Sequence, residues 1–203
     1  MNYSIKDKFI FFHVPKTAGT SIHSCFNGNL RSLYSDLGVN YERLSGFLKV
    51  IDTHVSASEV KSKLGLSYNE YFTFAFVRNP WDWRVSLYKY ICKSKHHPCH
   101  KLYKEYKDFA DYIKNTKYVN TRLQFEYISD NNEVIIDYVG RFENLQEDFN
   151  IICDKIGIPQ QQLPHKNPTK HKHYTEYYDD ETRQIVAERY AKDIEYFGYE
   201  FGE

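Results

Sequence analysis

The sequence predicts an α/β fold in which a parallel sheet is flanked by helices on both faces. Apolar runs typical of buried strands occur at Phe9–Val14 and Tyr71–Val77, and each is followed by a polar turn and a segment with helical spacing of apolar residues. Strands that alternate with helices favour a mostly parallel sheet. No internal repeat or linker divides the chain, so residues 1–203 are expected to form a single domain.

Further elements are expected along the chain. The apolar runs Gly46–Ile51 and Ile135–Val139 predict two more strands. Helical patterns predict helices at Val60–Leu64, Tyr103–Lys114, Asn144–Ile156 and Asp179–Tyr196.

The first turn follows the strand at Phe9–Val14 and reads PKTAGTS. Pro15 cannot donate to a sheet, and the next residues can begin a helix whose first amides are free to bind an anion. Lys16 adds a mobile positive charge, and the hydroxyls add donors. The pattern predicts a P-loop-like phosphate site made of Pro15, Lys16, Thr17, Ala18, Gly19, Thr20 and Ser21. It is not a Walker A loop, which ends Gly-Lys-Ser/Thr, and an ordinary polar turn is the alternative.

The second turn follows the strand at Tyr71–Val77 and reads Arg78-Asn79-Pro80. Asn79 is suited to cap a helix that has Pro80 at its first position. Arg78 then lies at the carboxyl end of a strand, where ligands of open α/β sheets bind. Ser86 is too far along the helix to be a cap. The arginine and this hydroxyl are therefore expected to hold a second phosphate.

Together these segments resemble a known family. A strand ending in PKTAGTS, followed by FVRNPWDWRVSLYKY, is similar to the nucleotide-binding pair of sulfotransferases that use 3′-phosphoadenosine 5′-phosphosulfate (PAPS). The resemblance is closest to the branch with carbohydrate 2-O- and chondroitin-type enzymes. Val139–Phe149 and His165–Phe201 also resemble the family, so the likeness covers nearly the whole chain.

The resemblance implies roles for particular residues. The turn at Pro15–Ser21 would bind the 5′-phosphosulfate, with Lys16 contacting the sulfuryl group and the bridging oxygen. Arg78 and Ser86 would bind the 3′-phosphate. The chain departs from the family at Trp83, where many relatives have arginine, and carries Arg84 one position later.

His54 is the expected general base. It follows an apolar strand, so it should lie near the carboxyl edge of the sheet, and related sulfotransferases place a histidine between the two motifs. An acceptor hydroxyl must lose its proton as it attacks sulfur, and an imidazole with a pKa near 6.5 can take it. The alternative is that His54 caps a helix or packs. His13 is expected to be structural, and His23 to lie on a helix face.

The predicted activity is in-line transfer of the sulfuryl group from PAPS to an acceptor hydroxyl, with the 3′,5′-bisphosphate as product. The basic loops and the family branch favour a carbohydrate as the acceptor. No metal is expected, because Lys16 and the helix terminus neutralise the departing phosphate. A small-molecule or sugar kinase would share the phosphate-binding turn but needs a carboxylate for magnesium, which neither motif supplies. A non-catalytic nucleotide-binding protein is the other alternative, although it has no use for a base.

Composition narrows the class of protein further. Lys+Arg and Asp+Glu balance at 27 each, which gives no overall signal for nucleic-acid binding. No apolar run is long enough for a membrane span, and the N-terminus lacks signal-peptide features, so a cytoplasmic protein is expected. The four cysteines form no CxxC pair. Cys92–Lys101 has the residue types of a zinc site but not the spacing, and is expected to form a basic loop. His165–His173 is a second basic cluster, and two such loops suit an anionic nucleotide and an anionic acceptor. For the acceptor, ordinary solvated loops are the alternative.

Overall fold

The computed structural model describes residues 2–26, 31–32, 54–116, 122–164 and 172–203. The strand predicted at Gly46–Ile51 lies outside these ranges. The chain forms two compact units. Unit 1 comprises Met1–Val77 and Gln124–Lys166, and unit 2 comprises Arg78–Leu123 and Asn167–Glu203. In the described part of the chain, no helix has the length and apolar character needed to cross a bilayer.

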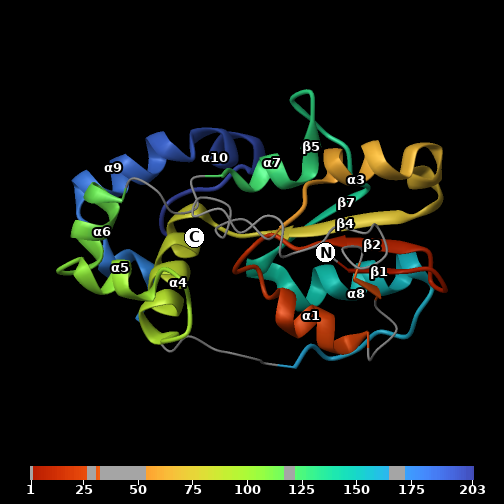
Figure 1. The fold of residues 1–203 in the computed structure, drawn as a ribbon, viewed down its shortest axis with the longest axis horizontal. Coiled ribbons are helices and arrows are strands. Elements are labelled where there is room, and N and C mark those ends of the chain that lie inside the picture. The colour runs from red at the N-terminus through yellow and green to blue at the C-terminus, as the bar shows by residue number, and fades with distance from the viewer. Residues whose placement is uncertain (1, 27–30, 33–53, 117–121, 165–171) are drawn as a thin grey trace. The chain divides into compact units, whose positions relative to one another are not determined.

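Unit 1 contains a five-stranded sheet with the order β3-β1-β2-β4-β7 (Figure 1). Its strands are β1 (Asn2–Ser4), β2 (Phe9–Phe12), β3 (Arg31–Ser32), β4 (Phe72–Val77) and β7 (Tyr138–Arg141). β2, β4 and β7 are parallel, as the sequence predicted. β1 runs antiparallel to both β2 and β3, so the sheet is mixed at one edge. β5 (Ser129–Asp130) and β6 (Glu133–Val134) form a separate antiparallel pair.

Aromatic side chains fix how the central strands pack. Phe11 lies opposite Phe74 in the β2–β4 register, and their rings stack with centroids 5.1 Å apart. Phe76 lies opposite Gly140. A Cβ at Gly140 would lie 2.6 Å from the Phe76 ring, so only glycine fits there. The parallel register therefore depends on a large residue facing one that has no side chain.

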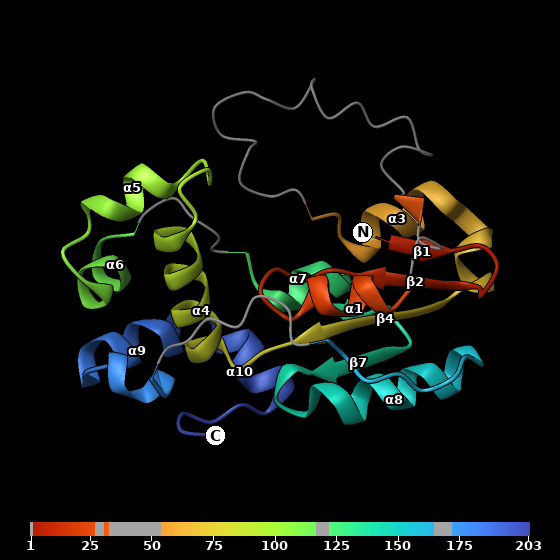
Figure 2. The same cartoon turned by 90° about the horizontal axis from the view of Figure 1, so that it is seen from below.

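Helices cover both faces of this sheet, which confirms the predicted layers (Figures 1 and 2). α1 (Gly19–Cys25) and α8 (Leu145–Ile156) lie on one face, and α3 (Ala57–Leu64) and α7 (Gln124–Ile128) on the other. The α1 and α8 side chains share a buried core with the strand phenylalanines, which includes Ile22, Phe26, Phe149 and Ile152. The 3-10 helices η2 (Gly65–Glu70) and η3 (Phe142–Asn144) complete unit 1.

The strand predicted at Ile135–Val139 begins later in the structure than the sequence indicated. The sequence favoured Ile135–Val139, whereas β7 spans Tyr138–Arg141. The preceding residues are bound elsewhere, since the amide of Ile135 donates to the Ile128 carbonyl. The Asp137 carboxylate accepts from both the amide and the hydroxyl of Thr73, at 2.7 Å each. The Asp137 amide also donates to the Thr73 carbonyl at 3.0 Å, so these side-chain bonds reinforce the backbone pairing just before the strand.

Unit 2 is helical and rich in aromatic residues. Its helices are α4 (Pro80–Lys93), α5 (His100–Glu105), α6 (Phe109–Asn115), η4 (Tyr174–Tyr177), α9 (Asp180–Arg189) and α10 (Ala191–Phe197). Tyr88, Tyr103 and Tyr112 pack against one another with ring centroids 4.9–6.1 Å apart. The tyrosine-rich composition thus supplies a core.

Two helices predicted as continuous are broken. The stretch Tyr103–Lys114 contains the end of α5 and most of α6, because Asp108 adopts an extended backbone and accepts from the Asp111 amide as an N-cap. The stretch Asp179–Tyr196 contains α9 and most of α10. Their junction is Tyr190, whose φ of −114° and ψ of 24° leave the helical region. Both breaks occur without glycine or proline, so the sequence carried no strong signal for them.

Candidate functional site

The turn after β2 has an unusual backbone. Lys16 and Ala18 have φ angles of 64° and 63°, in the left-handed region that residues other than glycine seldom adopt. Such positions cost about 1–3 kcal/mol each and cluster at functional sites. Backbone that alternates into this region forms concave arrangements of amide groups that bind anions. The Ala18 carbonyl then accepts from Ser21 and Ile22 and starts α1.

The side chains of this turn differ in exposure. The Thr17 hydroxyl is buried and donates to the Val14 carbonyl at 2.8 Å, so it closes the turn. Pro15, Gly19 and Ser21 are also buried, and Lys16 is half-buried. Thr20 is the exposed hydroxyl. Lys16 and Thr20 are thus the side chains of the turn that are best placed to meet a ligand from solvent.

Two histidines meet beside this turn. His13 follows the last residue of β2, and its ring centroid lies 4.7 Å from that of His54, edge to face at 84°. Tyr127 lies on the His54 ring in a similar manner, with centroids 6.3 Å apart. The fold therefore brings His54 to the end of β2, where the phosphate turn begins.

His13 is held in its neutral form. Burial, together with the nearby positive charges of His54, His23 and Lys16, lowers its pKa to about 3. A neutral imidazole cannot act as a cation for a phosphate. Lys16 is accordingly the charged side chain that this turn offers to an anion.

The turn after β4 belongs to unit 2 and has a different construction. The Asn79 side chain accepts from the Trp81 amide at 3.1 Å and Pro80 opens α4, which confirms the predicted cap. Arg78 is 6% exposed and binds one Asp82 oxygen through Nε at 2.8 Å and through a terminal nitrogen at 2.7 Å. Ser86 is 2% exposed. Both residues predicted to hold the second phosphate are thus buried.

Arg84, which follows the departure from the family pattern at Trp83, lies in the aromatic core of unit 2. It is fully buried and donates to the Tyr112 hydroxyl. Its guanidinium lies 5.0–5.8 Å from the centroids of the Tyr112, Tyr190 and Trp83 rings. These cation–π contacts give Arg84 a role in packing.

The C-terminal segment, defined as residues Tyr199–Glu203, is bound to the start of α4. The Asn79 amide group donates to the Glu200 carbonyl at 2.9 Å, and the Gly202 amide donates to the Tyr174 hydroxyl at 2.6 Å. Phe201 is surrounded by the rings of Trp81, Tyr174 and Tyr178, at 5.5–5.6 Å between centroids. The Arg183 guanidinium covers it at 4.7 Å. Sequence reasoning missed this arrangement; the aromatic spacing in YFGYEF was its available signal.

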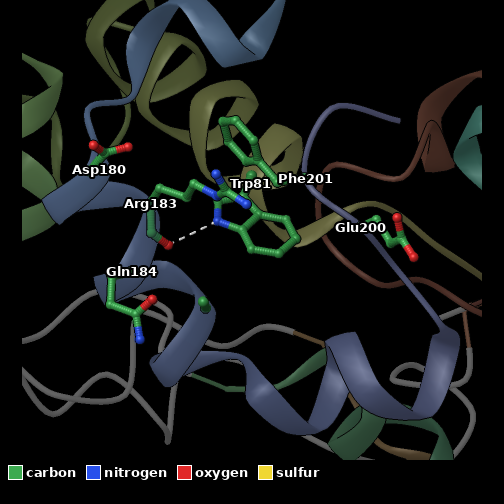
Figure 3. A pocket seen from close by; sticks show the side chains of 7 residues that line it. Trp81, Asp180, Arg183, Gln184, Glu200 and Phe201 are labelled. Carbon is green, nitrogen blue, oxygen red and sulfur yellow. Dashed lines mark hydrogen bonds between the residues drawn. The ribbon is translucent and has the colours of Figure 1, made fainter.

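A pocket of about 490 Å³ opens beside this segment (Figure 3). It is lined by Trp81, Asp180, Arg183, Gln184, Ala187, Glu200 and Phe201. The Trp81 ring nitrogen donates to the Arg183 carbonyl at 3.1 Å, as the dashed line in Figure 3 shows. None of the predicted site residues lines this pocket.

The cysteine- and histidine-rich segment has structural contacts of its own. His100 binds the Ile91 carbonyl through Nδ1, and His97 Nδ1 accepts from the Cys99 amide. Burial raises the pKa of the Cys92 and Cys99 thiols, so thiolate formation is disfavoured. Over the ranges that the structure describes, no three His, Cys, Asp or Glu side chains are grouped to hold a metal ion.

Comparisons with known proteins place this chain in a family. The sequence model of the Sulfotransferase family matches residues 1–200. An uncharacterized protein from Archaeoglobus fulgidus is 30% identical over 106 residues, which cover 50% of this chain and 82% of that protein. No solved structure gives a significant match. With a match over almost its whole length, the chain belongs to the sulfotransferase family, and it is a transferase of sulfuryl groups.

Proposed function

We propose that this protein transfers the sulfuryl group of PAPS to an acceptor hydroxyl, with His54 as the general base. The observation that carries the proposal is the position of His54 beside His13, immediately before the strained turn that contains Lys16. A proton acceptor and an anion-binding turn then share one end of β2. Sulfuryl transfer needs both in reach of one substrate.

The reaction balances with these groups. The acceptor oxygen forms a bond to sulfur while the bond from sulfur to the bridging phosphate oxygen breaks. The acceptor proton passes to His54, and the 3′,5′-bisphosphate leaves with the bonding electron pair. Lys16 and the amides of the turn stabilise the charge that develops on the bridging oxygen.

Arg78 and Ser86 are assigned to the 3′-phosphate. The ion pair with Asp82 holds the Arg78 guanidinium through two of its nitrogens, so its orientation is set before the nucleotide arrives. A phosphate at this position would share the arginine with a carboxylate. The site is therefore expected to contribute more to selectivity for the 3′-phosphate than to affinity.

The acceptor is assigned to the carbohydrate class, and the protein to the cytoplasm. The sugar assignment rests on the resemblance of the PKTAGTS and FVRNP segments to carbohydrate sulfotransferases. The location rests on sequence composition. A kinase remains less well supported, since Asp82, the carboxylate nearest in sequence to Arg78, is engaged by that arginine.

The direct test is turnover of PAPS by the purified protein against a panel of sugars, a tyrosine peptide and a simple alcohol. His54→Ala should lower turnover about 100-fold or more and leave binding of the bisphosphate nearly intact. The matched control is His23→Ala, which removes an exposed histidine on α1. Absence of turnover with every acceptor, together with equal binding of ATP and the bisphosphate, would contradict the proposal.

A further inference from the structure

We infer that His13 is a positioning residue which links the start of α1 to His54, and that residue 19 is glycine to make room for the His13 ring. The inference rests on the proposed function, since it takes His54 as the base. A Cβ added to Gly19 would lie 2.0 Å from His13 Nε2 and 2.1 Å from its Cδ2. No side chain fits at residue 19 while the histidine stays in place.

The backbone conformation of Gly19 does not explain the glycine. The residues of this turn with left-handed φ are Lys16 and Ala18, and both carry a Cβ. Gly19 is instead the first residue of α1, where any residue is conformationally allowed. The close approach of an imidazole to its Cα therefore accounts for the glycine.

The His13 ring is held on its other sides as well. Phe11 stacks on it, with centroids 5.8 Å apart and planes at 26°, and His54 meets it edge to face at 4.7 Å. The ring thus touches the strand, the first helical residue and the base at once. Since burial keeps it neutral, it fills this position as a packing group and adds no charge next to Lys16.

A displaced His13 would release His54 from one of its contacts. Misplacement of a catalytic group by about 1 Å can lower a rate by about 100-fold. Substitutions of His13 or Gly19 should therefore reduce kcat while the turn itself, and with it the KM for PAPS, changes little. A glycine required for phosphate approach would give the opposite pattern, with loss of nucleotide affinity.

The experiment is a double-mutant cycle with Gly19→Ala, His13→Ala and the double variant. Each single substitution should lower kcat about 10-fold to 100-fold, with the KM for PAPS within about threefold of wild type. The double variant should be no slower than the slower single variant, because the smaller residue 13 leaves room for the new methyl group. The inference would be overturned if the fold-losses in kcat of the two single variants multiplied in the double variant. It would also be overturned if Gly19→Ala lowered only the affinity for the bisphosphate and left kcat unchanged.

His13→Phe keeps the test decisive if His13→Ala unfolds. Phenylalanine retains a ring between Gly19 and His54, so kcat should recover to within about threefold of wild type. A folded His13→Phe protein as slow as His13→Ala would show that the imidazole nitrogens are needed and that packing is not the role. His54→Ala separates the two proposals. Normal turnover in this variant would refute the assignment of His54 as the base. Slow turnover in His54→Ala together with normal turnover in His13→Ala would refute only the inference about His13.

Discussion

The turn after β2 and the turn after β4 both connect a buried strand to a helix, yet they are stabilised in different ways. The first keeps two non-glycine residues, Lys16 and Ala18, in left-handed backbone and leaves its lysine half-buried. The second has an ordinary proline-initiated helix start, and its Arg78 is buried against Asp82. The backbone of the first turn is therefore strained, whereas the second turn is stabilised by side-chain hydrogen bonds and an ion pair.

This difference has a chemical consequence. Amide groups and a half-buried ammonium are available to stabilise charge that develops during a reaction. A buried arginine that already binds a carboxylate gains less from a phosphate, because its charge is partly compensated. The first turn is therefore suited to chemistry, and the second to recognition of a group that does not react.

The largest effect is expected from Lys16→Ala, which removes the charge of the first turn. Turnover should fall by about 100-fold or more, the scale of losing one preorganised donor, while binding of the bisphosphate weakens less. Lys16→Arg should rescue only partly, because a planar guanidinium does not replace a compact ammonium. Single-turnover assays and calorimetry measure the two quantities, and the exposed Lys6→Ala is the control. If Lys16→Ala abolishes binding but spares the rate at saturating PAPS, the lysine is only an anchor.

Phe201→Ala tests how far the second turn depends on side-chain contacts. The substitution removes the ring that packs among Trp81, Tyr174 and Tyr178. The free energy of unfolding should fall by about 2 kcal/mol, less than for a fully buried phenylalanine. Tyr196→Ala, at a side chain with 53% exposure, is the matched control and should change stability by less than about 0.5 kcal/mol. Equal urea midpoints for the two variants would show that the C-terminal segment does not stabilise this turn.

Arg78→Lys tests recognition at the second turn. Lysine keeps the charge but cannot contact a phosphate and Asp82 through a planar fork. The preference for the 3′,5′-bisphosphate over a 5′-phosphate nucleotide should fall about tenfold, with affinity for the 5′-phosphate nucleotide unchanged. Titration calorimetry with both nucleotides measures this ratio. If the affinities for both nucleotides fell equally, Arg78 would serve only to support the fold.

The last prediction concerns the pH dependence of stability in unit 1. The pKa of His13 is about 3 in the folded chain and 6.5 in the unfolded chain, so the unfolded chain binds an extra proton between these values. The contribution of neutral His13 to the free energy of unfolding is therefore complete above pH 6.5 and is lost as the pH falls towards 3. The slope from this group is at most about 1.4 kcal/mol per pH unit.

Urea unfolding at pH 7, 6, 5 and 4 measures that slope. His13→Phe should flatten the curve over this range, whereas His23→Ala, at an exposed site, should leave it unchanged. An identical slope in wild type and His13→Phe would mean that His13 titrates in the folded protein as it does in the unfolded chain.

The sequence by itself predicted the parallel strands β2, β4 and β7, the helices on both sheet faces, and the cap at Asn79. These features follow from local causes, namely apolar runs, periodicity and the fixed φ of proline. It also predicted an anion site at the turn of Lys16 and a general base at His54, and both stay predictions about function.

Only the tertiary structure decided which groups meet. Tertiary packing, which no local sequence pattern encodes, brings His13 against His54 and buries Arg78 against Asp82. It also sets the position of Phe201. The same holds for Gly19, which the sequence predicted only as part of the phosphate site, whereas in the structure the neighbouring His13 ring leaves no room for a side chain there. Local propensity sets the elements, but steric exclusion and burial select the partners of each side chain.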